Sequence, residues 1–396
     1  MLLLIASGSC SQDEDMRMPV PDDQSDISDP GLSLALKKAE KMRNLLDKSE
    51  TRSGMLEIKA IEKLNSGQTR SEESPVDVYV VNYKDDKGFA LLSSDTRTSM
   101  IYGISTSGSL SFRDTVDNPG LRMYLEEIMP SLIKYELSQN AKNERSDFQT
   151  RGSGIQQLVS YKDPMLYGNV GKWHQGDPYN SLCPVGDYQG KRYLVGCSAL
   201  AIAQVMSYYM YPTGYNGHPY PWVEMIKMDK DDNYNPAMPF LAQLLADLGD
   251  ENNLKMEYGY SGSTGREKYY KQTFKNYRYN VLDSAAMNIS IATLNMDNDH
   301  PVLATGHSVR GGQHAFLIDG YTTSRGSAGL TTYLHCVWGY GGSSNGYYLF
   351  NYQNSRIEPA GYDFLDKFDD PSINQTPLPA FERLKMYIVL PDRTNN

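Results

Sequence analysis

Apolar residues recur at helical spacing in two stretches of the first 140 residues. The pattern predicts an amphipathic helix over residues 31–47 and another over residues 120–137, with a kink expected at Pro130. Two β-rich runs between residues 76 and 92 flank an Asp-Asp-Lys-Gly turn and predict a hairpin. Helix, hairpin and helix together predict a small α+β unit.

This periodicity disappears over residues 140–154, where small polar residues surround Arg145 and Arg151 and a Gly-Ser-Gly run follows. Such composition is typical of a flexible linker that proteases can reach. We therefore divide the chain into a tether over residues 1–26, a first unit over 27–151 and a larger second unit over 152–396.

A different pattern opens the second unit. Residues 197–209 are almost wholly small or apolar, so the sequence predicts a helix that is buried on every face. Cys197 is its first residue and follows Gly196. Unpaired N–H groups and the positive end of the helix dipole favour thiolate over thiol at such a position. Cys197 is therefore a candidate nucleophile.

The remainder of the second unit is rich in β-forming residues. Helices followed by strands predict an α+β domain whose cleft lies between the two halves. We expect residues 314–320 and 331–338 to form an antiparallel hairpin around a loop at 322–330, with His314 opposite Val337. In that register Asp319 lies on the other side of the strand from His314 and serves the turn that follows.

Composition narrows the possible functions. The chain has 396 residues, a formal net charge of −10 and no basic run, which argues against nucleic acid or an anionic membrane surface as the main partner. Four cysteines in a chain of this length form no disulfide framework, and cysteines and histidines lack the spacing of a zinc site. We expect no metal or organic cofactor.

The first ten residues form a short apolar run that ends in small residues and Cys10. This order resembles the end of a bacterial lipoprotein signal, although a basic start is missing. We expect an extracytoplasmic bacterial protein that is secreted or held at the outer membrane or cell surface by a lipid on Cys10. A disordered start with a chance cysteine is the alternative.

A thiolate nucleophile needs a base, which is usually histidine. Among the six histidines of the chain, His314 directly precedes the apolar strand 315–318, so its ring can reach a cleft while the sheet holds its backbone. Taken alone, His314 is also compatible with a buried structural histidine. Cys183, before a proline, and Cys336, within a strand, are best interpreted as ordinary buried residues.

Several motifs occur together and in a fixed order. They are Trp-x-Gln at 173–175, Pro-Tyr-Asn at 178–180, Gly-Cys at 196–197, Gly-Gly-Gln-His-Ala-Phe at 311–316 and Trp-Gly-Tyr-Gly-Gly at 338–342. This set resembles the streptopain family of papain-fold cysteine peptidases. The first unit is similar to the propeptide of that family, so the resemblance covers nearly all of residues 30–396.

The resemblance implies a two-lobed papain-like domain with a helical and an antiparallel β part, preceded by an inhibitory propeptide. It implies Cys197 as nucleophile, His314 as its partner, Gln175 with the Cys197 N–H as oxyanion hole, and Trp338 as cover of the histidine. Ser263, Gly312 and Gln313 are further candidates for substrate contact. Arg145 and Arg151 are the expected processing sites.

One position departs from the family pattern. The family usually has Asn immediately before this tryptophan, but here the residue is Val337, which cannot hydrogen-bond through its side chain. We interpret the chain as the zymogen of a cysteine endopeptidase, monomeric, with protein or peptide substrates and its own propeptide as inhibitor. A catalytically retired surface binding or adhesion protein is the first alternative, and a transferase or amidase that uses the same dyad is the second.

Overall fold

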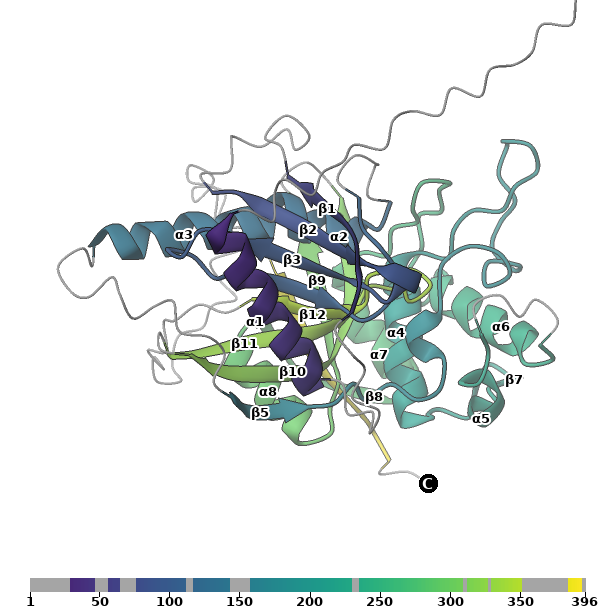
Figure 1. The fold of residues 1–396 in the computed structure, drawn as a ribbon. Helices are drawn as coiled ribbons and strands as arrows, with labels where there is room; N and C mark the ends of the chain where they lie inside the picture. The colour runs from purple at the N-terminus through teal and green to yellow at the C-terminus, as the bar shows by residue number, and fades with distance from the viewer. Residues whose placement is uncertain are drawn as a thin grey trace, which may run out of the picture.

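The computed structural model describes residues 29–46, 56–64, 76–111, 117–142, 157–229, 235–308, 312–326, 329–350 and 384–393. None of the helices in these ranges combines the length and apolarity needed to cross a membrane. Two groups of elements, an N-terminal unit up to residue 142 and a C-terminal unit from residue 157, share one mixed α+β architecture (Figure 1).

The described residues of the N-terminal unit form antiparallel strands and helical segments. Its elements are α1 (Pro30–Leu46), β1 (Ile58–Lys63), β2 (Val78–Tyr83), β3 (Phe89–Ser93), β4 (Ile101–Ser105), α2 (Pro119–Met123), η3 (Tyr124–Ile128) and α3 (Met129–Lys142). The predicted helix over 31–47 is confirmed by α1, which packs on β3 and β4. The predicted hairpin is confirmed by the antiparallel pair β2–β3, and the turn between these strands holds Asp85 and Asp86 at positive φ.

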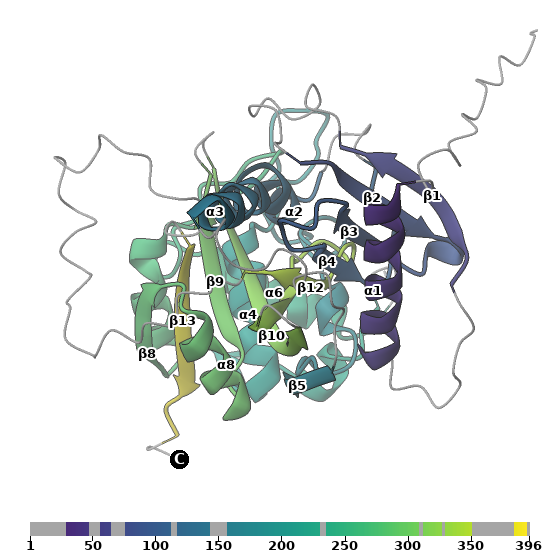
Figure 2. The same cartoon turned by 60° about the vertical axis from the view of Figure 1, so that its left-hand side comes forward.

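The second predicted helix is interrupted before Pro130 rather than simply bent at it. The segment η3 is a π-helical turn that joins α2 to α3. Proline has no N–H to donate to the preceding turn, so the wider π turn accommodates Pro130 within one continuous helical path. This path lies over the sheet near β9 and β10 (Figure 2).

The C-terminal unit begins with one strand and a group of helices. The helices α4 to α7 form the half seen on the right of Figure 1. The elements are β5 (Gln157–Lys162), α4 (Cys197–Tyr209), β6 (Gly214–Tyr215), β7 (His218–Pro219), α5 (Trp222–Met225), α6 (Met238–Gly249), η5 (Glu267–Tyr269) and α7 (Tyr270–Asn276).

Strands dominate the rest of this unit. They are β8 (Tyr279–Ala286), β9 (Val302–His307), β10 (Gln313–Gly326), β11 (Gly329–Val337), β12 (Gly346–Leu349) and β13 (Leu384–Pro391), with α8 (Ile289–Asp297) between β8 and β9. One sheet runs through both units in the order β1-β2-β3-β4-β12-β11-β10-β9-β13-β8, with β5 also paired to β10. Because β4 pairs with β12, the N-terminal unit extends the sheet of the C-terminal unit.

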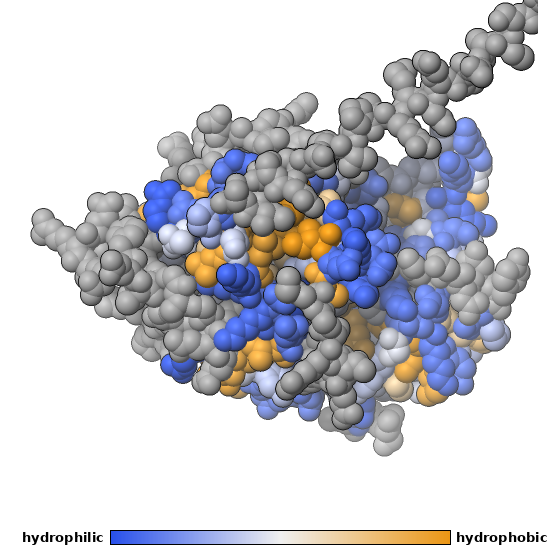
Figure 3. Space-filling model, viewed as in Figure 1, coloured by the Kyte–Doolittle hydropathy of each residue, from blue (hydrophilic) through white to orange (hydrophobic). Residues whose placement is uncertain are grey.

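Strand β10 separates two hydrophobic cores. Phe316 and Ile318 face the core shared with the N-terminal unit, whereas Ala315 and Leu317 face the core built around α4. This alternation is that expected of a strand covered on both faces. The surface seen in the view of Figure 1 is mixed, with hydrophobic residues gathered near its middle and hydrophilic ones around them (Figure 3).

The predicted register of the β10–β11 hairpin is wrong. Leu317, not His314, lies opposite Val337, and paired strand continues to Gly326 and Gly329. The segment 322–330, expected as a loop, contains threonines that pair across the strands, and Thr323 and Thr332 share a hydroxyl hydrogen bond of 3.0 Å. Threonine favours pleated structure, so a polar run was misinterpreted as a turn.

Asp319 lies at a bulge of β10 and not at a turn, which also corrects the sequence interpretation. Its carboxylate lies 2.6 Å from Nδ1 of His335 and accepts a hydrogen bond of 3.2 Å from the backbone N–H of Leu166. The expectation that Asp319 does not orient His314 agrees with these contacts.

Candidate active site

Cys197 begins α4, as the sequence predicts. Gly196 before it has φ of +94°, and a Cβ at this glycine would lie 2.8 Å from the carbonyl oxygen of Ser263, so glycine is required here. Every residue of α4 from Ser198 to Ser207 is buried. The nucleophile candidate therefore stands at the start of a helix that the surrounding core holds fixed.

The sulfur of Cys197 lies beside the strand that carries His314. The backbone N–H of Ala315 donates to Sγ at 3.4 Å, and Sγ lies 3.9 Å from the carbonyl oxygen of Gln313. These two residues flank His314. Cys197 therefore lies against the part of β10 that carries His314, which is 117 positions away in the sequence.

The imidazole of His314 is directed away from the sulfur. Its Nε2 donates to the carbonyl oxygen of Trp338 at 3.0 Å, and its ring stacks parallel to Phe316 with centroids 6.3 Å apart. Only 4% of the residue is exposed. Within the described residues no hydrogen bond joins Sγ of Cys197 to the imidazole.

Helix α2 of the N-terminal unit packs directly on this histidine. A Cβ at Gly120 would lie 2.6 Å from Cδ2 of His314 and 2.5 Å from Cε3 of Trp338, so only a glycine allows so close an approach. The side chain of Asn118 begins α2 by accepting hydrogen bonds from the N–H groups of Gly120 and Leu121. The sequence predicted the helix but gave no signal for this contact.

Burial shapes the protonation of both groups. Desolvation lowers the pKa of His314 from 6.5 to about 4, so the imidazole is neutral at neutral pH. Burial likewise raises the pKa of the Cys197 thiol, although hydrogen bonds from Ala315 and Ser198 act in the opposite direction. Without an imidazolium beside it, Cys197 is a thiol in this state.

Trp338 is fully buried and packs against Phe316 with ring centroids 4.8 Å apart. Its backbone N–H donates to the side chain of Asn345 at 3.1 Å, and Asn345 in turn donates to Gly171 O at 2.9 Å. Sequence reasoning missed this asparagine, since nothing in its spacing marks it. Val337 is buried in the core around α4 and offers the histidine no polar group.

Gln175 lies against the segment that leads to the nucleophile. Its carbonyl oxygen accepts from the N–H of Val195 at 2.9 Å, two residues before Cys197. The residue is 8% exposed, and within the described residues its side chain makes no hydrogen bond. A buried amide with unused donors is the kind of group that an oxyanion hole needs, and this role stays a prediction.

The three weaker substrate candidates differ in their surroundings. Ser263 is 4% exposed and its hydroxyl donates to Leu194 O at 2.6 Å, so its side chain holds the loop before Cys197 instead of facing a cleft. Gln313 donates to the hydroxyl of Tyr270 at 3.5 Å. Gly312 is exposed, with nothing within 4 Å of where its Cβ would stand. Contact of these residues with substrate stays a prediction.

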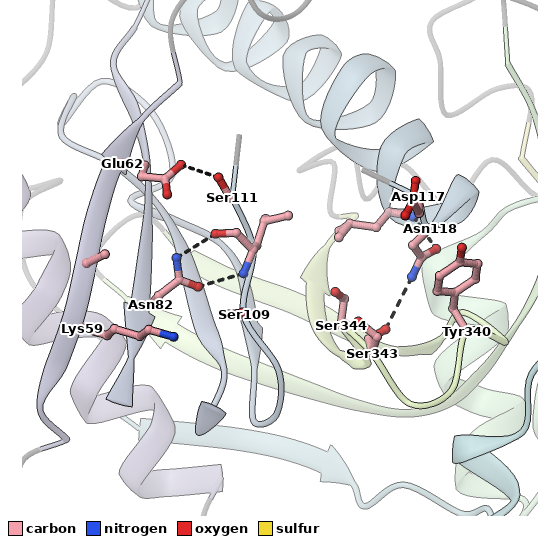
Figure 4. Close-up of a pocket in the computed structure, with 13 residues that line it drawn as sticks. Lys59, Glu62, Asn82, Ser109, Ser111, Asp117, Asn118, Tyr340, Ser343 and Ser344 are labelled. Atoms are coloured by element: carbon pink, nitrogen blue, oxygen red, sulfur yellow. Dashed lines mark hydrogen bonds between the residues drawn. The ribbon is translucent and has the colours of Figure 1, made fainter. Parts of the chain in front are cut away.

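A polar pocket of about 410 Å³ lies between the two units, beside the start of α2. Lys59, Asn82 and Ser109 of the N-terminal unit form one wall, and Tyr340 and Ser343 of the C-terminal unit form part of the other (Figure 4). Asn118 donates to Ser343 O at 3.4 Å across the boundary between the units. Cys197 is not among the pocket residues, so the pocket belongs to the interface between the units.

Other predictions fall outside the described residues. The possible lipidation site Cys10 and the possible processing sites Arg145 and Arg151 are among them. The unit boundaries at residues 27, 151 and 152 also lie there and stay predictions.

Comparison with known proteins matches both units. Residues 173–348 match the Peptidase C10 family, and residues 33–131 match the Spi protease inhibitor family. Streptopain of Streptococcus pyogenes is 27% identical over 337 residues, which cover 74% of this chain and 78% of streptopain. The thiol protease/hemagglutinin PrtT of Porphyromonas gingivalis is 25% identical over 310 residues, which cover 70% of this chain and 34% of that protein.

The fold matches a solved structure of a prointerpain A fragment from Prevotella intermedia. The TM-score is 0.53 at 20% identity, and the alignment covers 83% of this chain and 98% of the fragment. Both units are therefore present in one known arrangement. The chain therefore carries a Peptidase C10 domain, the cysteine peptidase domain of the streptopain family, with a Spi-type propeptide region ahead of it.

Proposed function

We propose that the chain is a latent cysteine endopeptidase in which Cys197 and His314 form the catalytic dyad only after the propeptide has left. The observation that carries this proposal is the position of the imidazole. It is hydrogen-bonded to Trp338 O and covered by Gly120, whereas the sulfur accepts a hydrogen bond from the N–H of Ala315. Both reacting groups belong to one site, but a propeptide helix occupies the space around one of them.

The mechanism follows from what each residue offers. Once His314 turns from Trp338 toward Cys197, it can accept the thiol proton and form a thiolate–imidazolium pair. The thiolate attacks the peptide carbonyl, and His314 then protonates the leaving amine. Water hydrolyses the thioester with His314 as base.

The tetrahedral oxyanion needs donors that are already in place. We assign this role to the side chain of Gln175 and the N–H of Cys197. A single oxyanion-hole donor typically contributes about 3 kcal/mol to transition-state stabilisation. The buried, unused amide of Gln175 beside Val195 supports this assignment.

We further propose that cleavage at Arg145 or Arg151, by the enzyme itself or by another protease, starts activation. Cleavage alone leaves β4 paired with β12 and α2 packed on His314, so loss of these contacts is the second requirement. The resemblance of residues 1–10 to a lipoprotein signal supports a secreted or lipid-anchored enzyme at the bacterial surface. Substrates are proteins or peptides, and the enzyme acts as a monomer.

The test is casein hydrolysis by the purified full-length chain during processing. We expect activity to rise as the propeptide is lost and Cys197→Ala to abolish it. Undiminished activity in Cys197→Ala would refute the proposed mechanism. A processed chain that cleaves no protein substrate, with Cys197 no more reactive than Cys183 or Cys336, would favour the retired binding protein, for which Val337 in place of asparagine is the supporting observation.

A further inference from the structure

A buried hydroxyl network lies directly beside the nucleophile and has no role in the mechanism so far. The hydroxyl of Tyr270, the first residue of α7, lies 2.6 Å from Oγ of Ser198, and Ser198 Oγ donates to Gly265 O at 3.0 Å. Tyr270 and Ser198 are 0% and 1% exposed. Ser198 follows Cys197 in α4, so this network reaches the residue next to the sulfur.

The same network reaches the strand that carries the histidine. The side chain of Gln313 donates to the Tyr270 hydroxyl at 3.5 Å, while its carbonyl oxygen lies 3.9 Å from Sγ of Cys197. Tyr270 also packs against Tyr387 of β13 at 5.4 Å between ring centroids. One phenol thus connects α4, α7 and β10 around the reactive sulfur.

The available donors and acceptors fix which hydroxyl donates to which oxygen in this network. Gln313 fills an acceptor position of the Tyr270 oxygen, so the phenolic proton is donated to Ser198. Ser198 then keeps its own proton for an acceptor, which is Gly265 O while Cys197 is a thiol. When the sulfur ionises, a thiolate is the stronger acceptor, because hydrogen bonds to a charged group are the stronger ones.

We propose that Tyr270 and Ser198 are positioning residues that stabilise the Cys197 thiolate independently of His314. The catalytic meaning of this inference rests on the proposed function, in which Cys197 is the nucleophile. Tyr270 acts through Ser198. The phenol donates to the Ser198 oxygen, which leaves the Ser198 hydroxyl free to turn from Gly265 O to the sulfur and donate a hydrogen bond to it when Cys197 ionises.

The surroundings of the sulfur explain why such donors matter. Burial is the largest influence on Cys197 and raises its pKa, while the N–H of Ala315 and the hydroxyl and N–H of Ser198 lower it. The imidazole of His314 is engaged by Trp338 O, and Val337 supplies no polar side chain. Hydroxyl donors in the catalytic domain are therefore a source of thiolate stabilisation that does not wait for the histidine.

Other titratable groups around the network are already engaged. Glu267 of η5, whose carboxylate acts on Tyr270, is held by His307 of β9 and Lys385 of β13 at 3.0 and 2.9 Å. From the N-terminal unit, Arg122 acts on His314. None of these groups has to change protonation for the Ser198 hydroxyl to redirect its hydrogen bond from Gly265 O to the sulfur.

The test uses the full-length latent chain, in which His314 is turned away and cannot mask the effect. The rate of Cys197 alkylation by iodoacetamide, resolved by mass spectrometry, is measured between about pH 6 and 11 to give the midpoint of thiolate formation. We expect Tyr270→Phe and Ser198→Ala each to raise this midpoint by about 0.5 to 1 pH unit. The double variant should raise it no further than the larger single change.

Tyr277→Phe is the matched control, because this buried tyrosine at the end of the same helix has its hydroxyl near Asp247 and should leave the midpoint unchanged. Thermal unfolding separates a purely structural role, which would lower the melting temperature without moving the midpoint. Unmoved midpoints in Tyr270→Phe and Ser198→Ala would overturn the inference. If Tyr270→Phe does not fold, Ser198→Ala decides alone. Loss of proteolysis in Cys197→Ala tests the proposed function separately, whatever the midpoints show.

Discussion

The two members of the proposed dyad, Cys197 and His314, are held in place by different parts of the chain. The cysteine is fixed from within the catalytic domain, by Gly196, the buried helix α4 and the N–H of Ala315. The histidine is fixed partly from outside, because Gly120 of the propeptide lies on its ring. We therefore propose that latency acts on the base, whose contacts the propeptide supplies, whereas the catalytic domain alone positions the nucleophile.

If the propeptide controls His314, the largest expected effect is a pH dependence of propeptide docking. The pKa of His314 is about 4 in the latent state, against 6.5 for an ordinary imidazole. The released state therefore binds the extra proton between these values. In a chain without the Cys197 thiol, docking of the propeptide is at full strength above about pH 6.5 and loses about 3 kcal/mol as the pH falls toward 4.

Hydrogen exchange of residues 119–128 in the full-length Cys197→Ala chain, which cannot process itself, measures this effect. We expect protection, corrected for the intrinsic exchange rate, to fall between pH 7.5 and 5. The change His314→Phe in the same background removes the titrating group and should flatten the dependence. Equal loss of protection with and without His314 would assign the effect to another group.

A substitution at Gly120 should act on the histidine side alone. In Gly120→Ala the new methyl group would collide with Trp338 and His314, so we expect docking to weaken by about 2 kcal/mol. Self-processing at neutral pH should then become faster, as followed by gel electrophoresis over time. Gly171→Ala is the control, because its Cβ would meet only Asn345, at an ordinary 3.6 Å. Unchanged processing in Gly120→Ala would argue that its contact does not maintain latency.

A smaller effect is expected from the cap of α2. Asn118→Ala removes the acceptor of the Gly120 and Leu121 N–H groups, and the loss of such a cap costs about 1 kcal/mol. Processing should quicken only slightly, and Asn118→Asp, which keeps the acceptor, should resemble the unchanged chain. If Asn118→Asp matches Asn118→Ala instead, the hydrogen bond to Ser343 O, and not the cap, is the stabilising contact.

Local patterns made part of this arrangement predictable. The apolar spacing of residues 31–47 matches α1, and the small residues after Cys197 match a helix buried on all faces. Both are properties of a single segment, in which periodicity reflects the side that is covered. The proximity of His314 to Cys197 followed from the family resemblance, because no periodicity links positions so far apart.

Contacts between distant segments were not predictable in this way. The pairing of β4 with β12, the bond from His314 to Trp338 O and the hydroxyl of Tyr270 beside Ser198 all depend on tertiary packing. The β10–β11 register failed because Thr322 and its neighbours were interpreted as a loop, although they continue the strand. Backbone acceptors such as Trp338 O leave no trace in the order of side chains.

The central claim is most directly tested by comparing the reactivity of Cys197 before and after release of the propeptide. Iodoacetamide alkylation at pH 6, resolved by mass spectrometry with Cys183 and Cys336 as internal references, reports the fraction of thiolate. Release should allow His314 to pair with the sulfur and accelerate alkylation of Cys197 by about 100-fold, because a paired histidine lowers the thiol pKa by several units. Equal rates for Cys197 in the latent and the released enzyme would contradict the account.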